Sequence, residues 1–164
     1  MNIAEQKLRS RIRRWIIVFI IGLVLSGVTA FPLESELAFL SGHLSWAPDV
    51  LQQWIGKIYF AVKTTNQQFP YLSYGTDWLA FGHLVIAMAF VGPLRDPVKN
   101  IWVIEFGMIA CVMVIPLAFI AGPIRGIPIY WRLIDCCFGV FGIIPLYICY
   151  QDIKKLADIV KLKP

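Results

Sequence analysis

Three ionisable side chains stand where the surrounding sequence is strongly apolar: His83, Arg132 and Asp135. Arg132 and Asp135 are three residues apart, so on a helix they share one face. His83 lies between Ala80 and Ala87 on a comparable stripe. An imidazole beside a carboxylate can transfer a proton near neutral pH, and a guanidinium can hold an anionic or carbonyl-bearing group. We therefore predict that the three side chains point into one space and anchor a lipid, isoprenoid or quinone-type ligand.

Three further residues near the outer membrane boundary extend this candidate ligand site: Asp77, Arg125 and Trp131. Trp131 lies about one helical turn from Asp135. Two alternatives stay open. The polar side chains could form an internal clasp that fixes helix packing, with each contact contributing on the order of 1 kcal/mol. Arg132 could also extend its side chain to the lipid headgroups.

Glu105 is an isolated carboxylate in another apolar segment. Near the start of a helix its negative charge is favoured by the helix dipole. Arg95 and Lys99 are close enough in sequence to pair with it. We expect an ion pair at the inner membrane boundary, with an ion- or proton-binding carboxylate as the alternative.

No sequence motif for a metal, a cofactor or a known reaction is present. The four cysteines fall in apolar segments without CxxC or Cys/His spacing, which favours a packing role for them. Neither a Gly-rich phosphate loop nor a nucleophile elbow occurs. We predict no metal site, and the sequence leaves open whether the chain uses a cofactor or catalyses a reaction.

The composition indicates a membrane protein. Of the 164 residues, 59% are hydrophobic and 15% are charged, against about half and about a quarter in a soluble domain. The single core of a protein of this size cannot bury so many apolar residues, so apolar surface must face lipid. The net charge is +5. The basic residues lie beside the apolar segments, where they mark the cytoplasmic side. This placement argues against a nucleic-acid partner.

We predict a single all-α membrane domain over residues 1–164, a bundle of four transmembrane helices with an amphipathic helix in the long first outer loop. The spans are about 15–31, 78–94, 101–121 and 129–150, and the loop is 32–75. The first span could instead be a secretory signal, cleaved after Val28-Thr29-Ala30. Gly22 and Ser26 form a small-residue pair that favours a retained, closely packed helix.

The long outer loop is predicted to have structure of its own, because structureless loops of that length are rare. Pro48 begins a helix over about 48–65. Apolar residues recur along it at helical spacing, with polar residues between them: Leu51, Trp54, Ile55, Ile58 and Val62. Such a helix suits the membrane interface, where it would also form a lid over the ligand site.

The distribution of basic residues predicts the orientation. Eleven Lys and Arg residues belong to the two termini and the loop between the second and third spans, and four belong to the remaining segments. By the positive-inside rule, both termini are cytoplasmic, in a plasma or bacterial inner membrane.

Three functions follow from these observations. The leading hypothesis is a membrane protein that binds an amphiphilic ligand in the outer half of the bundle. The second is an accessory or assembly subunit of a larger membrane complex, docked through its aromatic outer loop. The third is a membrane enzyme with His83 and Asp135 as an acid–base pair. A transporter is least favoured, because no repeat is visible. The expected partners are membrane lipid, an amphiphilic small molecule, and a membrane protein or a second copy of the chain.

Overall fold

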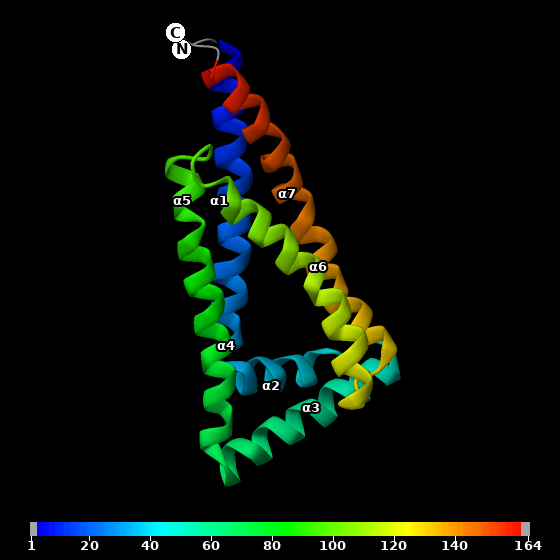
Figure 1. The fold of residues 1–164 in the computed structure, drawn as a ribbon. Coiled ribbons are helices and arrows are strands. Elements are labelled where there is room, and N and C mark those ends of the chain that lie inside the picture. Colours follow the sequence, from blue (N-terminus) through cyan, green and yellow to red (C-terminus); the bar gives the residue numbers. More distant parts are fainter. Residues whose placement is uncertain (1–2, 162–164) are drawn as a thin grey trace. The chain divides into compact units, whose positions relative to one another are not determined.

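The computed structural model describes residues 3–161, and all regular structure in that range is helical. The helices follow one another along the chain, as Figure 1 shows. They are α1 (Ile3–Ala30), α2 (Leu33–His43), α3 (Asp49–Gln68), α4 (Pro70–Ala89), α5 (Val91–Arg95), α6 (Ile101–Ile124) and α7 (Ile129–Lys161). The prediction of an all-α chain is confirmed.

Four stretches within residues 3–161 are long and apolar enough to cross a membrane. They are Glu5–Ala30, Pro70–Arg95, Ile101–Ile124 and Ile129–Lys161. The 24 residues of α6 span about 36 Å at 1.5 Å per residue, slightly more than the roughly 30 Å of bilayer hydrocarbon. Met113, Leu117 and Ile120 on this helix are exposed, as expected of side chains that face lipid. The structure thus has the four apolar helices that the sequence predicts.

The chain divides into two compact units. The first comprises Met1–Ile21 and Met88–Pro164, and the second comprises Gly22–Ala87. Helices α1 and α4 therefore contribute to both. The prediction of a single domain stays a prediction.

In the first unit, α6 and α7 pack side by side through small residues on α7. Gly139 lies so close to α6 that a Cβ atom there would be 2.3 Å from the carbonyl oxygen of Cys111. A Cβ at Gly142 would be 3.0 Å from the Cys111 sulfur. Leu146, farther along the same stripe, is fully buried. This stripe of α7 therefore faces α6.

The C-terminal part of α7 packs with the N-terminal half of α1. Buried apolar residues on the two helices are Ile12, Ile16, Cys149, Ile153 and Leu156. The Cys149 sulfur lies 3.6 Å from the carbonyl oxygen of Ile12. Helix α7 continues past the predicted span of about 129–150, because apolar residues recur there at helical spacing and keep the helix intact to Lys161.

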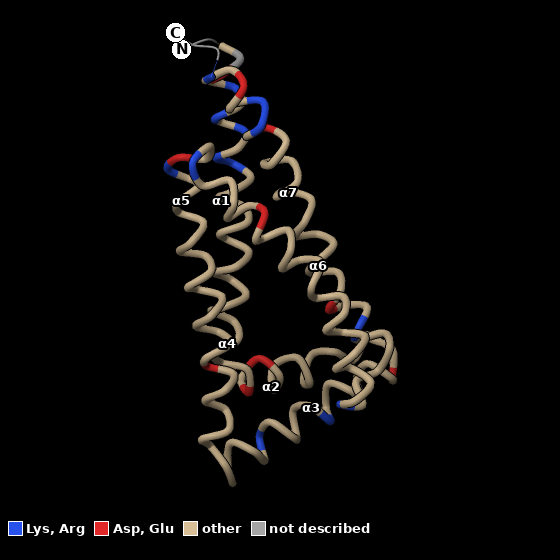
Figure 2. The backbone as a smooth tube through the Cα atoms, in the orientation of Figure 1, with Lys and Arg blue, Asp and Glu red and all other residues tan. Residues whose placement is uncertain are grey.

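A buried carboxylate takes part in this contact. The side chain of Asp152 is 1% exposed, and both of its oxygens accept hydrogen bonds from the guanidinium of Arg11. Two residues before Arg11, the Arg9 Nε donates to Oε1 of the buried Glu5 at 3.1 Å. A buried charge is costly without a partner, so the Arg11–Asp152 pair favours one register between α1 and α7. Figure 2 shows that Lys and Arg gather at this end of both helices.

In the second unit, α2 and α3 pack against each other. Pro48 is the N-cap of α3 and not a residue of its first turn, since its backbone is extended (φ −54°, ψ 142°). Its carbonyl oxygen accepts hydrogen bonds from the backbone N–H groups of Leu51 and Gln52, at 2.9 and 3.1 Å. The predicted outer loop is therefore helical over most of its length.

The small-residue contact of α1 in this unit is made by a different glycine from the one predicted. A Cβ at Gly27 would lie 2.9 Å from the carbonyl oxygen of Ala80 on α4. No described atom of the second unit lies within 4 Å of a Cβ at Gly22, so the predicted close packing at Gly22 stays a prediction. Gly27 lies on the face of α1 that contacts α4, and Gly22 does not.

Candidate functional site

The turn between α6 and α7 is built by a glycine and a proline. Gly126 has φ +67°, a left-handed conformation that glycine adopts without a Cβ penalty. Its N–H donates to the Pro123 oxygen at 3.1 Å, and the Ile127 N–H donates to the Gly122 oxygen at 2.9 Å. This pair of bonds is a Schellman cap. Pro128 follows directly, so α7 starts close to the end of α6.

A pocket of about 260 Å³ lies beside this turn, within the first unit. Most of its wall is aliphatic: Val114, Leu117, Ala118, Ala121 and Ile127. Its polar residues are Arg125, Arg132 and Asp135. Three of the six residues predicted for the ligand site therefore line one pocket, because the tight turn brings the start of α7 beside the end of α6.

The Arg132 side chain lies against α6 at Gly122. A Cβ at Gly122 would be only 2.3 Å from the Cδ atom of Arg132. The Arg132 Nε is buried and has no hydrogen-bond partner. Within residues 3–161, Arg132 and Asp135 form no ion pair with each other, although both border the pocket. Leaving a buried donor unsatisfied costs about 1–3 kcal/mol, so this N–H is available to an acceptor that enters the pocket.

The other predicted ligand-site residues lie elsewhere. Trp131 is half-buried on α7 and is not part of the pocket wall. His83 and Asp77 belong to the second unit. The Nδ1 atom of His83 is 2.8 Å from the carbonyl oxygen of Leu79, one turn earlier on α4. That His83 points into one space with Arg132 and Asp135 stays a prediction.

Glu105 is half-buried on α6. It forms no ion pair in the described part of the chain, so the expected pair with Arg95 or Lys99 is absent there. The Nζ atom of Lys99 instead lies 3.5 Å from Oδ2 of Asp96. An oxygen of Asp96 also accepts the backbone N–H of Lys99 at 3.2 Å, and this local contact holds the two residues together in the turn before α6.

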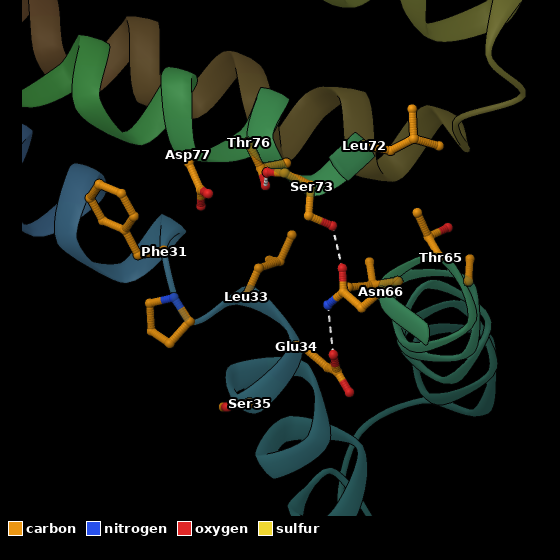
Figure 3. Close-up of a pocket in the computed structure, with 13 residues that line it drawn as sticks. Phe31, Leu33, Glu34, Ser35, Thr65, Asn66, Leu72, Ser73, Thr76 and Asp77 are labelled. Atoms are coloured by element: carbon orange, nitrogen blue, oxygen red, sulfur yellow. Dashed lines mark hydrogen bonds between the residues drawn. The ribbon is translucent and has the colours of Figure 1, made fainter. Parts of the chain in front are cut away.

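A second pocket, of about 410 Å³, lies within the second unit. Figure 3 shows a chain of hydrogen bonds along it, from Ser73 on α4 through Asn66 on α3 to Glu34 on α2. The Asn66 amide donates to Glu34 Oε2 at 2.6 Å, and the Ser73 hydroxyl donates to the Asn66 oxygen. Asp77 also lines this pocket.

Sequence reasoning missed Glu34, Asn66 and Ser73 as site residues. One signal was present, because Ser73, Thr76 and Asp77 recur at helical spacing where the apolar α4 begins. It predicts a polar face on that helix. It does not predict which residues of α2 and α3 meet that face.

Within residues 3–161, no group of three or more His, Cys, Asp or Glu is placed to hold a metal ion. Comparisons of the chain with protein families, with curated proteins and with solved structures found no match.

Proposed function

We propose that this chain is a membrane protein that binds an amphiphilic ligand, of the lipid, isoprenoid or quinone type, in the pocket beside the α6–α7 turn. The observation that carries the proposal is the buried, unpartnered Nε of Arg132 in a largely aliphatic pocket. The guanidinium would donate to a phosphate, carboxylate or carbonyl oxygen of the ligand head. The apolar part of the ligand would lie along Val114, Leu117 and Ala118.

The size and charge of the pocket support this ligand class. Pockets for drug-sized molecules measure about 300–1,000 Å³, so about 260 Å³ suits a headgroup and the first carbons of a chain. The exposed apolar surface of α6 would carry the rest of that chain. Two arginines, Arg125 and Arg132, and one carboxylate, Asp135, line the pocket, and this balance of charge favours an anionic or carbonyl head.

We further propose that the four apolar helices form a bundle with both termini in the cytoplasm, in a plasma or bacterial inner membrane. The surplus of Lys and Arg near both ends supports this orientation. The pocket would then lie at the outer end of α6. Helix α3 would lie in the outer interface as an amphipathic lid, since its Ile55 is buried while Lys57 and Lys63 are exposed. His83 would be a further polar anchor of the bound ligand.

Native mass spectrometry of the full chain in a mild detergent tests the binding proposal. Wild-type protein should retain a lipid-like molecule, and Arg132→Gln should lose it, because glutamine removes the charge and the Nε–H donor. Arg14→Gln, an equivalent change at an exposed residue of α1, is the matched control and should retain the ligand. His83→Ala and Asp135→Asn should also abolish the increase in stability that the bound ligand gives the protein. Equal retention in the wild type and all four variants would contradict the proposal.

An accessory subunit of a larger membrane complex is the second candidate. Large aromatic residues on and between α2 and α3 are exposed, among them Phe39, Trp46 and Phe60. The polar residues of the pocket would then form a structural clasp. Copurification of a stoichiometric protein partner, without a small molecule, would favour this function over ligand binding.

A membrane enzyme is the third candidate, with His83 and Asp135 as its acid–base pair. It requires both side chains to reach one substrate. A variant of His83 or Asp135 that still retains the ligand but no longer converts it to product would distinguish an enzyme from a binding protein.

A further inference from the structure

The pocket of the second unit differs from the first in its charge. Of the described residues that line it, none is Lys, Arg or His, and two are carboxylates, Glu34 and Asp77. We propose that this pocket binds a small organic cation, a primary ammonium group carried on a short apolar body. This pocket shares no lining residue with the Arg132 pocket.

The Glu34 carboxylate is held in place before any ligand arrives. Its Oε2 accepts the Asn66 amide at 2.6 Å, and Asn66 is in turn held by the Ser73 hydroxyl. A carboxylate has about four lone-pair positions on its two oxygens, so Glu34 keeps acceptor capacity for a ligand. Because the side chain is already ordered, binding loses less conformational entropy than at a free glutamate.

Two of the hydroxyl groups that line the pocket present lone pairs and not protons. The Ser73 O–H is used on Asn66, and the Thr76 O–H donates to the Ser73 carbonyl oxygen at 2.6 Å. These two hydroxyl oxygens therefore offer only acceptor sites to a ligand. An ammonium group has three donors and no acceptor, and it matches a wall of carboxylate and hydroxyl acceptors. The two carboxylates of the wall, Glu34 and Asp77, would repel an anion.

The rest of the wall favours an organic cation over a metal ion. Phe31, Leu33 and Val62 line the pocket, and Figure 3 shows Phe31 and Leu33 on the same side as Asp77. The volume of about 410 Å³ is within the range for small organic ligands. Two carboxylates without a third acidic, His or Cys ligand in the described chain make a poor cage for a divalent ion.

Binding of n-hexylammonium to the full chain in detergent tests the proposal, measured by calorimetry and by thermal unfolding. The cation should bind saturably and raise the melting temperature, whereas 1-hexanol and hexanoate should not. Glu34→Gln should weaken binding about tenfold, equivalent to 1.4 kcal/mol. Asp77→Asn should have a similar effect. Both amide variants keep an acceptor of similar shape, so the Asn66 contact and the fold are retained.

Glu36→Gln is the matched control, since Glu36 lies two residues along α2 from Glu34 and is not part of the pocket wall. It should bind n-hexylammonium as the wild type does, and so should Arg132→Gln. Equal binding of 1-hexanol, an equal loss in Glu36→Gln, or full displacement by magnesium chloride at matched ionic strength would overturn the proposal. If Glu34→Gln does not fold, Ser73→Ala replaces it, because it frees Asn66 without changing the charge and should still weaken binding.

Discussion

The Arg132 side chain occupies the space that a side chain at position 122 would need. A Cβ atom there would lie 2.3 Å from the Arg132 Cδ, so Gly122→Ala should displace the guanidinium from the pocket. We expect loss of the bound amphiphile and a destabilisation of about 1–3 kcal/mol from overpacking. Native mass spectrometry and thermal unfolding measure the two effects.

Gly82→Ala is the control for that change. Nothing lies within 4 Å of a Cβ at Gly82, and alanine is the better helix former by roughly 1 kcal/mol. This variant should keep its ligand and be no less stable than the wild type. If Gly122→Ala retains the ligand as Gly82→Ala does, the position of Arg132 does not determine binding.

Asp152 depends on one cation for its buried charge. Arg11→Ala would leave the carboxylate without that cation in an apolar contact, so the melting temperature should fall further than in Arg13→Ala, a change at an exposed residue of the same helix. Replacing the pair together, by Arg11→Met and Asp152→Leu, should restore much of the loss, because the buried charge is then gone. Equal melting temperatures for Arg11→Ala and Arg13→Ala would show that the pair adds no stability.

At the scale of elements, the close packing of α6 and α7 depends on Gly139. A Cβ at Gly139 meets the backbone oxygen of Cys111 at 2.3 Å, and backbone cannot move aside as a flexible side chain can. Gly139→Ala should therefore force the helices apart at a cost of about 1–3 kcal/mol, measured by denaturant-induced unfolding in detergent. Gly75→Ala, with open space around its Cβ, should show no such loss.

The long helices could be predicted because lipid-facing composition and helical spacing are local properties of a sequence. The Arg11–Asp152 pair could not, because its members are 141 positions apart and Asp152 follows the apolar segment as one more charged residue. The same reason explains the two pockets. Arg125 and Arg132 flank one tight turn and were predicted to share a site. Glu34, Asn66 and Ser73 come from three helices, and no spacing in the sequence links them.

At the scale of the whole molecule, α7 is too long for one membrane crossing alone. Its 33 residues measure about 50 Å at 1.5 Å per residue, against roughly 30 Å of hydrocarbon. The excess is accounted for at the C-terminal end, where Lys154 and Lys155 are exposed and the helix pairs with the basic start of α1. These paired ends would project into water, which suits both their charge and their buried apolar contact.

The Arg11–Asp152 pair requires the start of α1 and the end of α7 to lie on the same side of the membrane, whichever side that is. From the charge distribution we propose that this side is the cytoplasm. Single cysteines test both statements, introduced as Ser10→Cys, Lys155→Cys and Lys57→Cys after the native cysteines are replaced by alanine. In right-side-out vesicles, a membrane-impermeant maleimide should label only the cysteine at position 57, and the other two should react after permeabilisation. Labelling at positions 10 and 155 alone would invert the orientation and keep the pair. Labelling of only one of them would contradict the pair itself, because an ion pair cannot join residues on opposite sides of a bilayer.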